Sequence, residues 1–315
     1  MKLGRKIAAL AVAFAVSCGL PALAEDWAPS GNLTLQIGFG AGGSTDTIGR
    51  VLAQVMEEQT GWNIIVENKA GGGGVAMFTG IANRPPRGQI IGMGVNMPIL
   101  VNLVNRGDAL GFDVNSFDYL ATVADTPIVV VARSDAPYDD IAGLLEHAKT
   151  NGPVKAAFGA PPQKLVLDAA TRTTGAEFTA VSTKGGSEGM QLVLGGQVDI
   201  GFSSGEHFPF EEASDMKVIG TTAPERIKWA PDAQTFVENG VNAYANPIFY
   251  IATTAGTDPS AVKALTEAID AALQTDEVAK VVQNAIKNDP LNRGPEGTKQ
   301  MMVDGIDNVR VLFQK

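Results

Sequence analysis

Short runs of β-branched and apolar residues alternate along the chain with segments in which apolar residues recur every three or four positions. The first run is LTLQI (33–37). The apolar positions of the helical segment after it are Ile48, Val51, Leu52, Val55 and Met56. Gly61 follows them as a typical helix stop. This alternation predicts βαβ units and an α/β fold with mostly parallel sheets.

The same pattern continues to the end of the chain. It predicts further strands at 63–68, 89–95, 128–135, 154–158, 177–181, 198–202, 216–222 and 248–254. It predicts helices beginning at Val75 and near Pro98, and helices over 138–149, 163–173, 190–194, 259–273, 276–287 and 295–313. Strand crossings near 126 and 246 would divide these elements between two lobes. We predict one lobe from 25–126 plus 246–315 and a second from 127–245, in line with about 150 residues per domain.

The first 24 residues have the pattern of a signal peptide. MKLGRK is basic, IAALAVAFAV is apolar, and Ala22-Leu23-Ala24 forms a cleavage site before Glu25. Cys18, in AVSC, loosely resembles a lipoprotein signal but lacks the usual leucine, so cleavage after Ala24 is preferred. We therefore predict export to the periplasm and removal of residues 1–24.

Charge and cysteine usage narrow the function of the mature chain. Its 21 basic residues, after the loss of Lys2, Arg5 and Lys6, face 34 acidic ones, a net charge of −13. This balance argues against nucleic acid and anionic membranes as partners, but local donors can still bind an anionic ligand. Cys18 is the only cysteine, so thiolate sites and disulfides are excluded from the mature chain. We expect no metal site and no cofactor.

A glycine-rich loop joins the first predicted strand to the first predicted helix. Gly38, Gly40 and Gly43 satisfy G-x-G-x-x-G, the dinucleotide fingerprint. A strand–loop–helix of this kind points backbone N–H groups and the positive helix end at any anion. Asp46 in the first turn would repel a pyrophosphate, whereas Ser44 or Thr45 can cap the helix. An exported nicotinamide-dependent oxidoreductase is therefore the weaker hypothesis.

GFSSG (201–205) also matches the nucleophile elbow of hydrolases, with Ser203 as the nucleophile. Only His147 and His207 could serve as its base. His207 lies four residues after Ser203, where it could touch the hydroxyl but would be poorly placed as a triad base. Two distant histidines also argue against a zinc site. We therefore expect that this protein is not an enzyme.

Two loops of the second lobe resemble the first loop in composition. KGGSEG (184–189) and GAPPQ (159–163) each precede a predicted helix with small residues and backbone donors. Several helix N-termini could therefore face one cleft, as an anion-binding cleft between two lobes requires.

Four segments together carry a resemblance to a known family. IGFGAGGSTDTIGRVLA, IIVENKAGGGG, VSTKGGSEGMQLVLGGQVDIGF and PERIKWAPDAQTFVENG, in this order, resemble the solute-binding receptors of tripartite tricarboxylate transporters, the TctC or Bug proteins. The resemblance implies a type II-like periplasmic binding protein fold with a ligand cleft between lobes joined by two crossing strands. It also implies capture of a small organic carboxylate and its delivery to the membrane permease subunits. We expect a monomer.

The resemblance also implies which residues bind the ligand. Phe39 would pack on it, and Ser44, Thr45 and the amides near Gly43 would bind a carboxylate. Asn96, Gln163, Thr183 and Ser203 would add polar contacts; Lys184 would offer charge and Asp199 would orient loops. The full predicted set is Phe39, Gly42, Gly43, Ser44, Thr45, Asp46, Asn96, Gly159, Ala160, Gln163, Thr183, Lys184, Gly185, Asp199 and Ser203.

Some positions depart from the family pattern. Gly38 and Ala41 stand where the family has prolines, and Ser203 stands where it often has aspartate. The loop 159–163 lacks the usual hydroxyl residues, for which Gln163 could substitute. Few cationic residues lie in the expected cleft, which weakly disfavours a tricarboxylate as the ligand. Monocarboxylates, dicarboxylates, amino acids and aromatic acids all remain possible ligands. A sensing receptor that serves a signalling partner instead of a permease is the alternative function.

Overall fold

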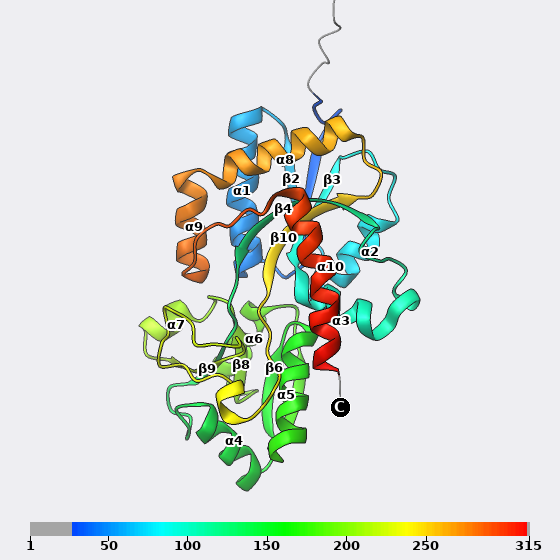
Figure 1. Ribbon diagram of the computed structural model, residues 1–315. Helices are drawn as coiled ribbons and strands as arrows, with labels where there is room; N and C mark the ends of the chain where they lie inside the picture. Colours follow the sequence, from blue (N-terminus) through cyan, green and yellow to red (C-terminus); the bar gives the residue numbers. More distant parts are fainter. Residues whose placement is uncertain (1–26, 314–315) are drawn as a thin grey trace, which may run out of the picture.

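The structure is a computed structural model that describes residues 27–313. The predicted signal peptide lies outside the described residues. Two five-stranded sheets lie one above the other, and two strand connections run between them (Figure 1). None of the helices in the described range is long and apolar enough to cross a membrane.

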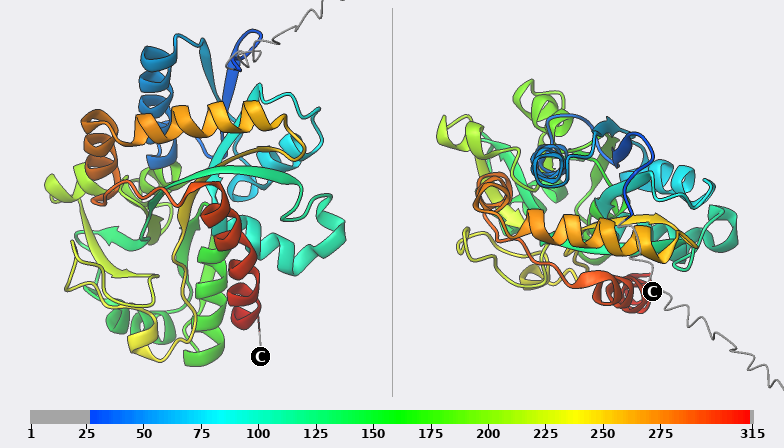
Figure 2. Two further views of the ribbon diagram at one scale, coloured as in Figure 1. Left: turned by 45° about the horizontal axis from the view of Figure 1, so that its top comes forward. Right: turned by 90° about the horizontal axis from the view of Figure 1, so that it is seen from above.

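The first sheet and its helices form lobe 1. The strand order is β2-β1-β3-β10-β4, with β1 (Leu33–Ile37), β2 (Ile64–Asn68), β3 (Ile90–Val95), β4 (Phe117–Asp125) and β10 (Ile248–Thr254). Its helices are α1 (Ser44–Thr60), α2 (Val75–Ala82), α3 (Asn96–Arg106), α8 (Pro259–Leu273), α9 (Asp276–Ile286) and α10 (Gly294–Leu312). Buried side chains of α1, α8 and α9 pack on one face, and those of α2, α3 and α10 on the other. Figure 2 shows this layering from two further directions.

The second sheet and its helices form lobe 2. The strand order is β7-β6-β8-β5-β9, with β5 (Val129–Arg133), β6 (Val154–Phe158), β7 (Phe178–Ser182), β8 (Ile200–Ser203) and β9 (Met216–Thr221). Its helices are α4 (Ile141–Thr150), α5 (Pro161–Thr174), α6 (Gly186–Leu194) and α7 (Phe208–Glu212). Val130 of β5 packs in one core and Val129 in the other, so both faces of the sheet are covered. This two-sided burial explains the unbroken β-branched run in the sequence.

The prediction of mostly parallel sheets is confirmed for strand direction, with one exception in each sheet. β10 is antiparallel to β3 and β4, and β5 is antiparallel to β8 and β9. The βα units direct the carboxyl ends of their strands toward the other lobe. A strand that arrives from the other lobe starts at this edge and runs away from it, which makes it antiparallel to its neighbours.

The predicted strands and helices are present, with two additions and several shifted starts. β4 and the short α7 were not predicted. The helices predicted to begin at Pro98, Gln163 and Met190 begin at Asn96, Pro161 and Gly186. Pro161 and Pro162 occupy the first turn of α5, where proline is favoured, whereas Gly186 has weak intrinsic helix propensity. The chain passes between the sheets at 126–128 and within 222–247, while the exact lobe boundaries stay a prediction.

Gly205, just after β8, is a point where the two lobes touch. A Cβ built on it would lie 1.6 Å from the carbonyl oxygen of Ala285 in α9, and its φ is +150°. Only a residue without a side chain allows this approach.

We expect Gly205→Ala to lower the free energy of unfolding by about 1–3 kcal/mol more than Gly240→Ala, because the added methyl group overlaps the Ala285 carbonyl. Gly240 is a matched control, since its φ is also positive, at +80°, but a Cβ there meets open space. Denaturant unfolding of both variants measures the difference. Equal losses would show that the lobes do not meet at Gly205.

Candidate functional site

A cavity of about 380 Å³ lies where the carboxyl edges of the two sheets face each other. Open α/β sheets bind ligands at this edge, because loops and helix N-termini converge there. Both lobes and both strand crossings contribute to its wall. The polar and small lining residues are Gly40, Ala41, Gly43, Ser44, Thr45, Thr126, Gly159, Ala160, Gln163, Lys184, Gly185, Gly186, Ser187, Glu188, Gln191, Ser204, Glu206 and Ala245. The remaining lining residues are Phe39, Val95, Met97, Pro98, Ile128, Pro162, Phe202, Pro247 and Phe249.

Asp46 holds the first loop in place from behind the cavity. Its carboxylate accepts hydrogen bonds from the Gly42 amide at 2.8 Å and the Asn68 side chain at 2.8 Å, and pairs with Arg50 at 2.9 Å. Burial alone would raise the pKa of Asp46, but the bonds from Arg50, Gly42 and Asn68 outweigh burial and lower it. The acid therefore shapes the loop and does not line the cavity.

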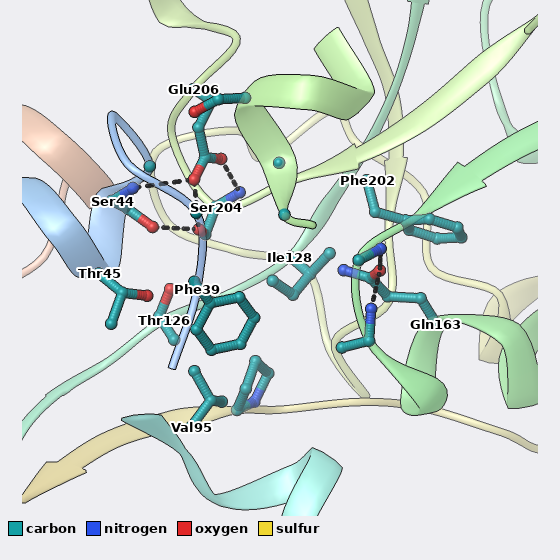
Figure 3. Close-up of a pocket in the computed structure, with 18 of the residues that line it drawn as sticks. Phe39, Ser44, Thr45, Val95, Thr126, Ile128, Gln163, Phe202, Ser204 and Glu206 are labelled. Carbon is teal, nitrogen blue, oxygen red and sulfur yellow. Dashed lines mark hydrogen bonds between the residues drawn. The ribbon is translucent and has the colours of Figure 1, made fainter. Parts of the chain in front are cut away.

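Glu206 of lobe 2 lies against the N-terminus of α1 in lobe 1. Its Oε1 accepts the Ser44 amide at 3.0 Å and its Oε2 accepts the Ser204 amide at 2.9 Å (Figure 3). Oε2 also accepts the Ser203 hydroxyl at 2.9 Å. The Ser44 and Ser204 hydroxyls are 2.6 Å apart. Burial alone would raise the pKa of Glu206, but these donors outweigh burial and lower it. At neutral pH the site therefore contains a fixed anion of the protein's own.

Only one glycine of the first-loop fingerprint is required by a close contact. A Cβ on Gly38 would lie 2.8 Å from the Gly74 backbone, whereas one on Gly43 would be in ordinary contact with Glu206 at 3.5 Å. The Gly40 amide donates to the Lys184 carbonyl oxygen of lobe 2 at 3.2 Å. The Glu206 carboxylate occupies the helix end where a dinucleotide fold would bind pyrophosphate.

Ser203 and His207 make the contact that a hydrolase would need, but away from the cavity. The Ser203 Oγ lies 3.0 Å from the His207 Nδ1, and the two residues are 1% and 0% exposed. Ser203 donates its hydroxyl proton to Glu206, so the close His207 contact requires a proton on Nδ1, and the pair supports the carboxylate. His207 Nε2 makes no hydrogen bond among the described residues, and the Glu211 carboxylate lies 3.7 Å from it.

Two hydroxyls in the wall have no partner. Thr126 Oγ1 and Ser187 Oγ are buried and make no hydrogen bond among residues 27–313, and the Thr126 residue is 1% exposed. Thr126 lies on the crossing between the lobes and Ser187 in the first turn of α6. Buried polar groups normally find partners, so these two hydroxyls are candidate donors to a ligand.

Gln163 presents a third polar group. Its Oε1 accepts the amides of Gly159 at 2.8 Å and Ala160 at 3.2 Å, which caps the start of α5. The side-chain amide nitrogen points toward Ile128 and the centre of the cavity (Figure 3). The missing hydroxyls of the 159–163 loop are thus replaced by one amide donor.

The structure brings most of the predicted site residues to the cavity. The predicted residues that line it are Phe39, Gly43, Ser44, Thr45, Gly159, Ala160, Gln163, Lys184 and Gly185. Those that do not line it are Gly42, Asp46, Asn96, Thr183, Asp199 and Ser203.

The predicted residues outside the lining have other contacts. Asn96 Oδ1 accepts the amides of Met97 and Ile248, Thr183 donates to the Gly185 carbonyl, and Asp199 accepts the Lys155 amide. These bonds hold strand ends and loops behind the cavity.

Sequence reasoning missed six polar lining residues: Thr126, Ser187, Glu188, Gln191, Ser204 and Glu206. Ser204 lies within the GFSSG motif and Glu206 directly after it, but the motif pointed to Ser203 as the candidate nucleophile. The only feature of the sequence that could have assigned Thr126 to the site is its position at the predicted crossing between the lobes. Among the described residues, no group of three histidine, cysteine or acidic side chains could hold a metal ion.

We expect the free energy of unfolding to fall steeply from pH 6.5 to 5 because of His207. Burial lowers the pKa of folded His207 to about 4, whereas the unfolded residue takes a proton near 6.5. Acid therefore stabilises the unfolded state, by roughly 3 kcal/mol once pH 4 is reached. Denaturant unfolding across this range measures the slope.

His207→Gln should flatten that slope, and His147→Gln, at the chain's other histidine, should keep it. If His207→Gln retained the wild-type slope, the buried neutral histidine would not be its cause.

Comparison with known proteins places this architecture in a family. Residues 48–315 match the family described as the tripartite tricarboxylate transporter family receptor, TctC. A Cupriavidus necator protein, the UPF0065 protein in the gbd 5' region, is 30% identical over 260 residues, covering 81% of this chain and 78% of the relative.

Solved structures share the fold. The periplasmic binding protein BugD superposes with a TM-score of 0.79 at 23% identity, over 91% of this chain and 97% of BugD. MatC from Rhodopseudomonas palustris, with bound malate, gives 0.80 at 21% identity, over 91% and 100% of the two chains. The chain is thus a binding receptor and not an enzyme, and it belongs to the TctC family of tripartite tricarboxylate transporter receptors.

Proposed function

We propose that this protein captures a small organic carboxylate between its lobes and delivers it to the membrane permease of a tripartite tricarboxylate transporter. The proposal places it in the periplasm as a monomer, after removal of residues 1–24. Family membership supports the receptor role. The ligand class is supported by the chemistry of the cavity and by the malate bound to MatC.

The observation that carries the proposal is the unpartnered Thr126 hydroxyl in the cavity wall. It lies between the lobes, where the first turn of α1 also presents Thr45 (Figure 3). A carboxylate accepts hydrogen bonds from hydroxyls, amides and helix N-termini without needing a cationic partner. Thr126, Ser187 and the Gln163 amide are donors of this kind.

The solute class can be tested by thermal unfolding after bound solute is removed by unfolding and refolding. Small carboxylates, aromatic acids, amino acids, NAD and NADP would be screened, each beside its neutral amide where one exists. A ligand at 100 times its Kd stabilises the folded state by about 2.7 kcal/mol, which raises the midpoint visibly. We expect a shift with one class of acid and none with its amide. A shift with NAD or NADP alone would overturn the proposal.

We expect Thr126→Val to weaken binding of the acid found in this screen by about tenfold, the loss of one hydrogen bond to a charged group. The ligand-free variant should be as stable as the wild type or more so, because an unpartnered buried hydroxyl has been removed. Isothermal titration and denaturant unfolding measure the two effects.

Thr266→Val is the matched control. The Thr266 hydroxyl is also buried without a partner among the described residues, but it lies on α8 outside the cavity. This variant should bind normally. If Thr126→Val also bound normally, its hydroxyl would not contact the ligand.

A further inference from the structure

The cavity wall contains a carboxylate that is held from both lobes. Glu206 accepts the Ser44 amide from lobe 1 and the Ser204 amide and Ser203 hydroxyl from lobe 2, at 2.9–3.0 Å. A fourth donor, the Ser204 hydroxyl, lies at 3.4 Å. Both oxygens are therefore satisfied by the protein, and the side chain is fixed in place.

The Glu206 carboxylate takes the position at two helix ends that a bound anion would use. It bonds the first amide of α1 directly. A Cβ built on Gly186, the first residue of α6, would lie 2.6 Å from the Glu206 carboxyl carbon. The positive ends of a lobe 1 helix and a lobe 2 helix thus already neutralise one negative charge.

The other charged residues of the wall do not offset the negative charge that a ligand brings. Lys184 is the only basic residue among the lining residues, and its side chain is exposed. Glu188, also exposed, adds a second acid to the half-buried Glu206. Each ligand carboxylate must therefore be held by neutral donors, and a second one brings a further unpaired charge next to Glu206.

The rest of the wall suits an apolar molecule. Phe39, Ile128, Phe202 and Phe249 contribute aromatic and aliphatic surface. The donors left for a ligand are the Thr126 and Ser187 hydroxyls and the Gln163 amide. Three neutral donors in an apolar wall fit one carboxylate on an apolar body.

We propose that Glu206 is a specificity-determining residue that restricts this receptor to monocarboxylates with an apolar body and excludes dicarboxylates. The inference rests on the proposed function. It distinguishes this chain from MatC, which has bound malate, a dicarboxylate.

Matched acids that differ only in a second carboxylate test the inference. In each pair a carboxylate replaces a terminal methyl group: butanoate and succinate, hexanoate and adipate, and 4-ethylphenylacetate and 1,4-phenylenediacetate. Isothermal titration at pH 7 with the refolded, solute-free protein measures both members of each pair. We expect the monocarboxylate of the best-binding pair to bind at least about tenfold tighter, the ratio that 1.4 kcal/mol gives.

Glu206→Gln should reduce that ratio below about threefold by strengthening dicarboxylate binding, because the fixed charge is gone while the side-chain size is kept. Glu212→Gln is the matched control: it removes one charge from an exposed residue of α7 outside the cavity, and should keep the wild-type ratio.

The two proposals fail in different ways. If the wild-type protein binds a dicarboxylate as tightly as the matched monocarboxylate, the role proposed for Glu206 is refuted, while the receptor function is unaffected. The same holds if Glu206→Gln keeps the wild-type ratio. If no acid of any pair binds, the carboxylate function is refuted and this inference with it. The ratio of monocarboxylate to dicarboxylate affinity in the wild-type protein tests the inference even if Glu206→Gln does not fold.

Discussion

The site depends on one hydrogen bond between the lobes, from the Ser44 amide at the start of α1 to the Glu206 carboxylate of lobe 2. The N-terminus of a helix has unsatisfied amides and a partial positive charge, so something anionic is favoured there. In this structure the protein supplies that anion itself. The bond connects elements 162 residues apart and places the two lobes edge to edge over the cavity.

Around this contact, side chains that look like ligand-binding or catalytic groups serve as supports. Asp46 holds the first loop, and Ser203 and His207 hold Glu206. Supporting hydrogen bonds of this kind position the groups that face a ligand. The donors that lack partners among the described residues lie elsewhere in the wall, Thr126 on the strand crossing and Ser187 in the first turn of α6.

Both misleading motifs of the sequence have a physical explanation in the fold. In G-x-G-x-x-G, Gly38 permits the close approach of the Gly74 backbone, and the Glu206 carboxylate occupies the helix end beyond the loop. GFSSG ends β8 and turns the chain so that Gly205 passes against Ala285 of α9. A short motif specifies a backbone geometry, and the partner that occupies that geometry comes from elsewhere in the chain.

The sequence by itself determined those features of the structure that depend on residues close together along the chain. Strand and helix positions such as LTLQI, the helix stop at Gly61 and the donor loops before α1, α5 and α6 follow from periodicity and local conformational preference. Only the tertiary structure decided the antiparallel direction of β5 and β10, and the use of Gly186 as a helix start. It also decided which polar residues face the cavity, because Thr126 and Glu206 acquire their roles from contacts across the two lobes. Such contacts between distant segments leave no periodic signal in one sequence.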